Sequence, residues 1–304
     1  MKTMKMKKPT MKKLGAALLA ATLFTGFGAV NVETVQAAVL VPTAAGINTA
    51  ANAQAEIDYS HARYGYVKVR FLQPGATSVR VIIDSPGGRR YQYRLNTNGD
   101  WEVFPLSEGN GSYTIGVFEQ VQGNRFAQAN TVTINVSLVN EFAPFLRPNQ
   151  FVNFNARSRV VAVAADVTRG STSMLDSVSR VFNFVIENIE YDTVLAQTVQ
   201  SGYVPDVDRV LERGMGICFD YAAVMTAMLR SQGIPTQLVI GYVGDVYHAW
   251  ISVYSEETGW INDMIQFDGN EWRIMDPTFA ATGGQAEAAQ FVGTGANHNP
   301  TRFH

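Results

Sequence analysis

The chain has 304 residues, of which 46% are hydrophobic and 16% are charged, and its formal net charge is -2 at pH 7. This length predicts about two domains of ordinary size. Because the charge is mildly acidic and no basic stripe occurs in the sequence, nucleic acid is not an expected partner. Cys218 is the only cysteine, so an internal disulfide is excluded.

The first 37 residues have the features of a secretory signal peptide. Six lysines lie between positions 2 and 13, an apolar stretch follows at 14–30, and residues 35–37 offer small side chains for cleavage. The apolar stretch is short compared with the ~20 residues of a membrane span, which favours a cleaved leader over an anchor. We expect cleavage after Ala37 and a secreted, extracellular protein without a stable membrane span. Its net charge would be -7, because the leader removes six lysines and Glu33.

The next part of the chain predicts a spacer and then an all-β domain. Residues 38–56 are rich in Ala, Thr, Asn and Gly without periodicity, which indicates a flexible spacer. Between 57 and 140, short runs of alternating apolar residues are separated by Gly- and Asn-containing turns about ten residues apart, which is typical of an immunoglobulin-like β-sandwich. Trp101 and Phe104 in this domain fit either the core or a carbohydrate or protein contact surface. No residue here suggests catalysis.

A connector with Pro144 and Pro148 leads to a region with a different pattern. Residues 160–167 are predicted to form a strand. Apolar residues recur every three or four positions over 175–189, which predicts an amphipathic helix with N-cap oxygens at 171–173. A short helix is expected at 207–212, capped by Asp206 and ended by glycines.

Cys218 follows these glycines at the start of another predicted helix, over 221–229, whose residues are mostly apolar. A thiol at a helix N-terminus faces unpaired N–H groups and the positive end of the dipole, so we expect a lowered pKa and an accessible thiolate. The N–H of Cys218 itself would form part of an oxyanion hole. The alternative is that this lone cysteine is a small buried hydrophobic residue.

Four strands are expected next, at 237–243, 247–254, 260–264 and 272–275. His248 begins the second strand and Asp276 follows the fourth. Neighbouring antiparallel strands would bring the two within hydrogen-bond reach, so that the carboxylate orients the imidazole toward the thiol. The alternatives are a structural histidine and an ordinary Asp-Pro turn.

The chain resembles the transglutaminase-like superfamily in three blocks: Gly216-Ile217-Cys218-Phe219-Asp220-Tyr221-Ala222, His248-Ala249-Trp250 and Asp276-Pro277-Thr278. The resemblance covers residues 155–285 and implies a core similar to that of papain-type proteases. It implies that Cys218 is the nucleophile, His248 the base and Asp276 the orienting carboxylate. Tyr191 matches an aromatic residue found upstream of the cysteine in the family and is implied in the far wall of the site.

Three further residues of these blocks receive supporting roles. Asp220 is turned about 200° from Cys218 on a helix, so a structural hydrogen bond is expected of it. Tyr221 is expected to pack or cap. Trp250 flanks His248 and either walls the approach to the sulfur or belongs to the core.

The predicted organisation is α+β. A signal peptide at 1–37 and a spacer at 38–56 precede a β-sandwich at 57–140. A catalytic domain of helices packed on an antiparallel sheet occupies 141–285, and a flexible tail at 286–304 contains His298 and His304. No cofactor is expected, and the single cysteine and scattered histidines give no metal-binding cluster.

Three functions stay open at this point. A transamidase would form a thioester from a glutamine side chain and transfer it to an amine. A cysteine protease or amidase would pass the same thioester to water. A binding module would keep the motifs as structure only. The expected partners of either enzyme are proteins or peptides outside the cell, including those of the cell wall.

Overall fold

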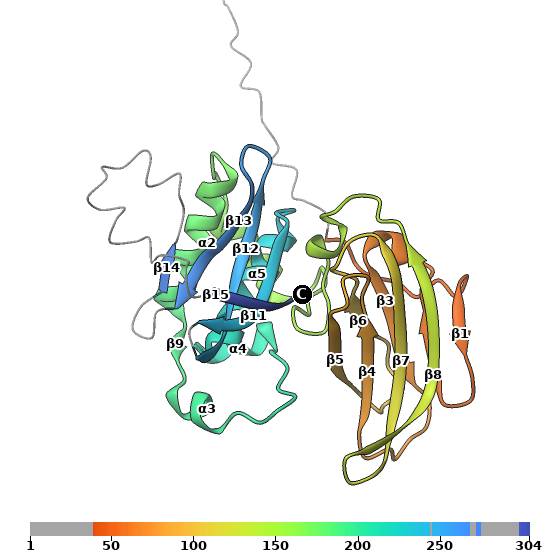
Figure 1. The fold of residues 1–304 in the computed structure, drawn as a ribbon. Coiled ribbons are helices and arrows are strands. Elements are labelled where there is room, and N and C mark those ends of the chain that lie inside the picture. Colours follow the sequence, from red (N-terminus) through yellow and green to blue (C-terminus); the bar gives the residue numbers. More distant parts are fainter. Residues whose placement is uncertain (1–38, 244, 268–271, 275–297) are drawn as a thin grey trace, which may run out of the picture. The chain divides into compact units, whose positions relative to one another are not determined.

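The computed structural model describes residues 39–243, 245–267, 272–274 and 298–304 (Figure 1). Contacts divide the chain into Met1–Val35 and Gln36–His304, and all described residues belong to the second unit. The predicted signal peptide and Asp276 lie outside the described residues. Among the described helices, none has both the length and the apolar composition needed to cross a membrane.

The N-terminal part consists of two four-stranded antiparallel sheets that share one core. The first has the order β1-β2-β3-β6 and the second the order β5-β4-β7-β8. Every second residue of β4 and β5 is buried, because successive side chains of a strand point to opposite faces. The strands are β1 (Thr49–Ala51), β2 (Ala55–Asp58), β3 (Tyr66–Phe71), β4 (Val79–Asp84), β5 (Arg90–Leu95), β6 (Glu102–Pro105), β7 (Gly111–Gln122) and β8 (Arg125–Val136).

The alternation predicted β3, β4, β5, β7 and β8 correctly, whereas β1, β2 and β6 were not predicted, and the expected spacer at 38–56 is wrong at its C-terminal end. Strand β1 and the start of β2 lie within it, and Ala55 is fully buried in the core. The side chain of Asn52 fixes this region, because its carbonyl oxygen accepts from the N–H groups of Gln54 and Ala55. The immunoglobulin-like assignment itself stays a prediction.

Residues 160–167 form a helix rather than the predicted strand. Helix α1 (Arg159–Val167) buries Val160, Val161 and Ala164. A short apolar run is compatible with either structure, and here a distant residue decides. The carboxylate of Asp208 accepts hydrogen bonds from the N–H groups of Arg159 and Val160, at 3.1 and 2.8 Å. It thereby satisfies amide groups that the first turn of a helix leaves unpaired.

The other helices agree with the sequence pattern. Helix α2 (Met174–Asn188) begins after Ser173, whose hydroxyl accepts from the N–H of Asp176. Helix α4 (Val207–Arg213) begins after Asp206 and ends at Gly214, which adopts the left-handed conformation that favours glycine. Helix α5 is Cys218–Ser231. A short helix, α3 (Thr193–Thr198), and a two-strand parallel pair, β9 (Glu190–Tyr191) with β10 (Met215–Gly216), were not predicted.

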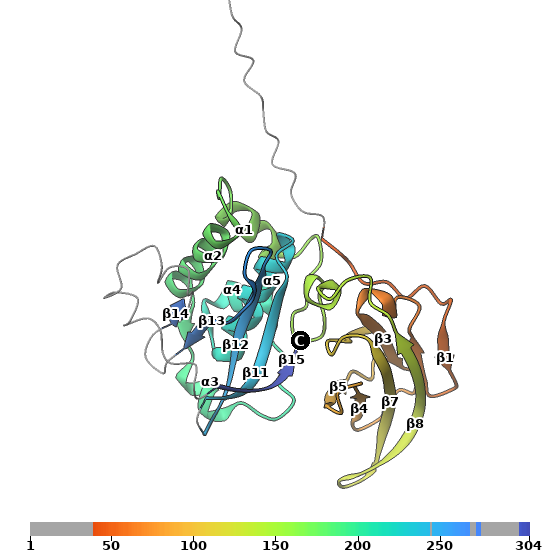
Figure 2. The same ribbon diagram turned by 45° about the horizontal axis from the view of Figure 1, so that its top comes forward.

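Helix α5 is the centre of the C-terminal part. It is buried almost along its whole length, and α1, α2 and α4 gather around it (Figure 2). Its other neighbour is an antiparallel sheet of order β14-β13-β12-β11-β15. These strands are β11 (Thr236–Val243), β12 (Val246–Ser255), β13 (Gly259–Phe267), β14 (Trp272–Ile274) and β15 (His298–Phe303), so all four predicted strands of this sheet are confirmed.

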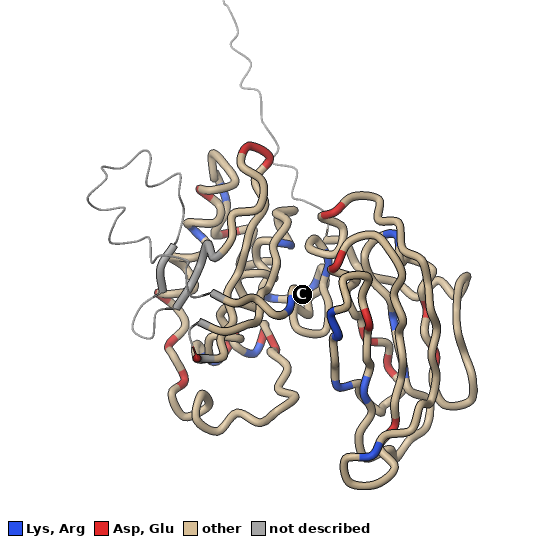
Figure 3. Tube along the Cα trace, viewed as in Figure 1, with Lys and Arg blue, Asp and Glu red and all other residues tan. Residues whose placement is uncertain are grey.

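The expected flexible tail is wrong for residues 298–304. Strand β15 pairs with β11, and His304 is 1% exposed. The reason is the buried guanidinium of Arg230, which donates to the main-chain oxygens of Thr236, Arg147 and His304 at 2.9, 2.6 and 2.5 Å. A buried cation requires such acceptors, and this segment supplies one. Basic and acidic residues are interspersed over the described chain (Figure 3).

Candidate active site

Cys218 is the first residue of α5, as the sequence predicted. The helix starts here because Asp220 folds back and its Oδ2 atom accepts from the N–H of Ile217 at 2.9 Å. Gly216 leaves room for this return, since a Cβ atom on it would lie 2.6 Å from the Cβ of Asp220. The side chain of Cys218 stays partly exposed.

Asp220 has the structural role expected of it. It is fully buried, and its second oxygen accepts from the hydroxyl of Tyr203 at 2.7 Å. Burial raises the pKa of Asp220, while the Ile217 N–H and the Tyr203 hydroxyl lower it. Burial, followed by the Asp220 carboxylate, raises the pKa of Tyr203, so the phenol remains a donor. Tyr203 was not predicted, because a tyrosine in a loop 17 residues before Asp220 carries no sequence signal of this contact.

Two tyrosines lie on the side of β9. Tyr221 is buried and donates its hydroxyl to the main-chain oxygen of Ile189, so it packs and ties α5 to the end of α2, as expected. Tyr191 lies with its ring centroid 6.4 Å from that of Tyr221. Burial and, after it, the charge of Cys218 raise the pKa of Tyr191. The role of Tyr191 in the far wall of the site stays a prediction.

His248 lies on β12, in register with Gly241 of β11. It is 8% exposed, and its ring lies 6.4 Å from that of Trp250 at an interplanar angle of 21°. Trp250 is 1% exposed and belongs to the core rather than to an open wall. Gly241 is required beside it, because a Cβ there would lie 2.9 Å from the ring of Trp250 and 2.9 Å from the Cα of Pro300.

The structure brings the sulfur of Cys218 to the strand that holds His248. The N–H groups of Ala249, the residue next to His248, of Phe219 and of Cys218 itself each lower the pKa of the thiol. Amide groups at a helix N-terminus thus act on the sulfur, including the one assigned to an oxyanion hole. Helix α5, which begins at Cys218, packs against β12, the strand that holds His248, although thirty positions separate the two residues in the chain.

The expected low pKa of Cys218 is wrong in direction. Burial raises the pKa of the thiol and is the largest influence, and the Asp220 carboxylate raises it further. The three N–H groups lower it but do not compensate. The helix terminus was the visible signal in the sequence, whereas the depth of the sulfur below the surface follows only from the packing of β12 and Phe219 against it.

Asp276 lies outside the described residues. The strand before it, β14, pairs antiparallel with β13, and β13 also pairs with β12. The prediction that the strands of His248 and Asp276 are direct neighbours is therefore wrong, because β13 lies between them. Among the described residues, no group of three or more His, Cys, Asp or Glu side chains is arranged to hold a metal ion.

The sequence profile of the transglutaminase-like superfamily matches residues 161–277. A protein of Bacillus subtilis (strain 168), described as uncharacterized protein YebA, is 29% identical over 154 residues. That match covers 44% of this chain and 19% of the relative, so the chain spans only about a fifth of the relative's length.

Two solved structures are also similar. A putative cysteine protease from Cytophaga hutchinsonii is 15% identical with a TM-score of 0.40, and the match covers 84% of this chain and 82% of that one. Red sea bream transglutaminase is 11% identical with a TM-score of 0.30, over 71% of this chain and 50% of that one. The profile match spans α1 to the third motif block and includes Cys218 and His248. The chain therefore contains a transglutaminase-like domain at residues 161–277.

Proposed function

We propose that this protein is a thiol acyl-transfer enzyme, in which Cys218 forms a thioester from an amide and passes it to water or to an amine. The observation that carries this proposal is the packing of α5, which begins with Cys218, against β12, the strand that holds His248; the N–H of Ala249 on that strand lowers the pKa of the thiol. A base and a nucleophile in this arrangement are what amide chemistry requires.

The raised pKa of Cys218 favours one form of the mechanism. The thiol is neutral at rest, so the imidazole of His248 takes its proton as the sulfur attacks the carbonyl carbon. The N–H of Cys218 stabilises the negative oxygen that forms. His248 then protonates the departing amine, and the C–N bond breaks to leave a thioester. Attack by water or a second amine, with the proton again passing to His248, releases the acyl group and restores the thiol. Asp276 is proposed to orient the imidazole.

The substrate class follows from the proposed location. We assign a signal peptide to residues 1–37, so the substrates are extracellular proteins or peptides, those of the cell wall included.

Aromatic side chains along the route to the sulfur support transfer to an amine in addition to hydrolysis. Tyr247 is 54% exposed, and burial and, more weakly, the charge of Cys218 raise its pKa. Burial and the charge of Cys218 also raise the pKa of Tyr191. We propose that these two rings restrict water at the thioester, which lengthens the time in which an amine can attack. Phe219, Tyr221 and Trp250, by contrast, pack against the core or within it.

The test is the partition of product from a glutamine-containing peptide incubated with increasing concentrations of a primary amine. Mass spectrometry distinguishes amine addition, free acid and a cut backbone, and Cys218→Ala is the inactive control. Amine addition supports transamidation, whereas free acid or cleavage alone supports the protease or amidase. An unchanged peptide together with a thiol that resists alkylation would instead support the third hypothesis, a binding module without catalytic activity.

Substitutions of Tyr247 and Tyr242 provide a matched pair of variants that tests whether an aromatic ring restricts water at the thioester. Their ring centroids lie 5.4 Å apart and both residues are exposed, and Cys218 is among the groups that raise the pKa of Tyr247. Tyr247→Ala should shift product toward free acid, while Tyr242→Ala, which removes the same ring contact, should not. Equal partitioning in both variants would remove the argument for transfer.

A further inference from the structure

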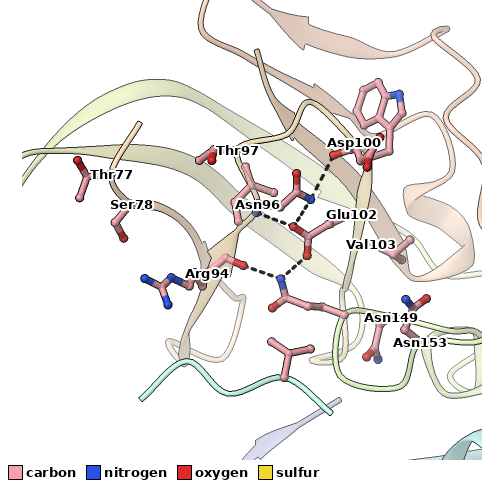
Figure 4. Close-up of a pocket in the computed structure, with 14 residues that line it drawn as sticks. Thr77, Ser78, Arg94, Asn96, Thr97, Asp100, Glu102, Val103, Asn149 and Asn153 are labelled. Carbon is pink, nitrogen blue, oxygen red and sulfur yellow. Dashed lines mark hydrogen bonds between the residues drawn. The ribbon is translucent and has the colours of Figure 1, made fainter. Parts of the chain in front are cut away.

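A hollow with both polar and apolar lining lies mainly in the N-terminal part and shares no residue with the Cys218 site. Its volume is about 630 Å³, within the range of roughly 300–1,000 Å³ that small-molecule sites occupy. The lining comes from the β3–β4 loop, from the end of β5 through the following loop to β6, from the segment around 149–153, and from Val204 in the loop before α4 (Figure 4). The hollow is thus formed where strand ends meet the connector.

The floor of this hollow is a fixed network of amide and carboxylate groups. The Nε2 atom of Gln150 donates to the main-chain oxygen of Arg94 at 2.6 Å and to Oε2 of Glu102 at 2.5 Å. The other oxygen of Glu102 accepts from the N–H of Asn96 at 2.7 Å and from its side-chain amide at 2.5 Å. Figure 4 shows these bonds as one connected chain.

Two atoms of the floor have no hydrogen-bond partner among the described residues, although both are buried. They are Oε1 of Gln150 and Nδ2 of Asn149, on residues that are 8% and 3% exposed. The neighbouring groups determine which atom of each side-chain amide is oxygen and which is nitrogen. The nitrogen of Gln150 donates to two acceptors, and the oxygen of Asn149 accepts from the N–H groups of Phe151 and Val152. Both atoms are covered by protein, so a ligand in the hollow meets the exposed groups of the walls instead.

The walls offer more groups of the same kind. Among the described residues, no protein partner holds the hydroxyls of Thr77, Ser78 and Thr97, the amide of Asn153 or the guanidinium of Arg94, and all of these line the hollow. Hydroxyls and amides present both donors and acceptors to a ligand. A ligand with many hydroxyl groups matches this lining better than an apolar one.

The charges of the lining and its one aromatic ring restrict the class of ligand further. One cation, Arg94, is accompanied by two carboxylates, Asp100 and Glu102, so the lining does not select an anion. Trp101 also lines the hollow, and the guanidinium of Arg70 lies 4.5 Å from its ring centroid, which holds the ring in place. A fixed aromatic surface beside hydroxyl partners suits the C–H and O–H groups of a sugar.

We propose that this hollow binds a neutral oligosaccharide. Its hydroxyl groups pair with the exposed hydroxyl, amide and guanidinium groups of the walls. A small peptide could use the same amides but would leave the carboxylates with fewer donors, because each peptide unit has one N–H and one C=O.

The test is calorimetric titration of the purified full chain with neutral tri- and tetrasaccharides of glucose and of N-acetylglucosamine, and with a neutral capped tetrapeptide. We expect at least one saccharide to bind with a Kd at or below ~1 mM, the weak end of specific association. Arg94→Ala and Asn153→Ala should each weaken binding by roughly fivefold or more, which is the loss of one hydrogen-bonding side chain. Both residues are exposed, so neither change should affect folding.

Asn135→Ala is the matched control, because Asn135 is exposed on β8, outside the hollow, and has no side-chain partner among the described residues. It should leave the Kd unchanged, and so should Cys218→Ala, since the hollow is separate from the thiol. The absence of saturation with every saccharide up to ~10 mM would overturn the proposal. So would saccharide binding that survives Asn153→Ala and Arg94→Ala, or binding of the tetrapeptide alone.

Discussion

Replacement of Asp220 tests how the nucleophile helix is held. The buried carboxylate accepts from the Ile217 N–H at 2.9 Å and from the Tyr203 hydroxyl at 2.7 Å. Asp220→Ala leaves both donors unpaired, and hydrogen bonds to a charged acceptor contribute about 1.5–3 kcal/mol each. Because burial disfavours the carboxylate itself, as its raised pKa indicates, we expect a net loss of about 2–4 kcal/mol in the free energy of unfolding.

Asp220→Asn should cost less. Its amide oxygen still accepts from Ile217, and its nitrogen can donate to the oxygen of Tyr203, so we expect a loss of about 1 kcal/mol or less. At roughly 2–4 °C per kcal/mol for a unit of this size, the Ala variant should melt about 4–16 °C below the parent protein. Thermal unfolding monitored by circular dichroism is the measurement. A melting temperature equal to that of the parent would refute this account of the helix start.

Asp176 provides the matched control, because it occupies the same position of α2, three residues after the N-cap, but lies at the surface. The Arg180 side chain and the Thr172 N–H lower its pKa below 3.8, whereas burial raises that of Asp220 above 3.8. A carboxyl with a raised pKa contributes stability at low pH that is lost as pH increases through its folded pKa. A carboxyl with a lowered pKa contributes stability that is lost as pH decreases through its folded pKa.

The two Asn variants should therefore respond to pH in opposite ways. Relative to the parent protein, Asp220→Asn should gain stability as pH increases from 3.8 upward, and Asp176→Asn should lose it as pH increases toward 3.8. Melting temperatures between about pH 2 and pH 7 measure both differences, since this interval includes the ordinary carboxyl pKa. Slopes of the same sign would contradict the assigned burial of Asp220.

Three further predictions concern the site and the C-terminal strand. Alkylation of Cys218 by iodoacetamide should have its midpoint above ~8.5, the ordinary cysteine value, because burial raises its pKa; rapid labelling near pH 6 would instead indicate an ion pair. His248→Ala should remove nearly all turnover and Asp276→Asn should leave a measurable remnant, so steady-state rates that are equal in His248→Ala and the parent would refute the base assignment. Arg230→Met should lower the melting temperature and increase hydrogen exchange in β15, because three main-chain oxygens lose their donor; unchanged exchange there would show that the strand does not depend on the guanidinium.

The sequence by itself determined the local structure and the identity of the motif. Alternating apolar residues marked the strands around Val79 and Tyr91, and N-cap side chains such as Ser173 and Asp206 marked helix starts. These signals are legible because they arise within a few residues of each other. The motif blocks that contain Cys218 and His248 predicted a shared site through their resemblance to a known family, and the structure packs α5, which begins at Cys218, against β12, which holds His248.

Only the tertiary structure decided the features that depend on distant residues. The carboxylate of Asp208 stabilises a helix at residues 160–167, whose pattern also fitted a strand. The guanidinium of Arg230 donates to the main-chain oxygen of His304 and so holds residues 298–304 against the domain. The pKa of Cys218 follows the same principle. A helix N-terminus favours the thiolate wherever it occurs, but burial by residues from another strand determines whether that effect prevails, and no local pattern encodes how deeply a side chain will be covered.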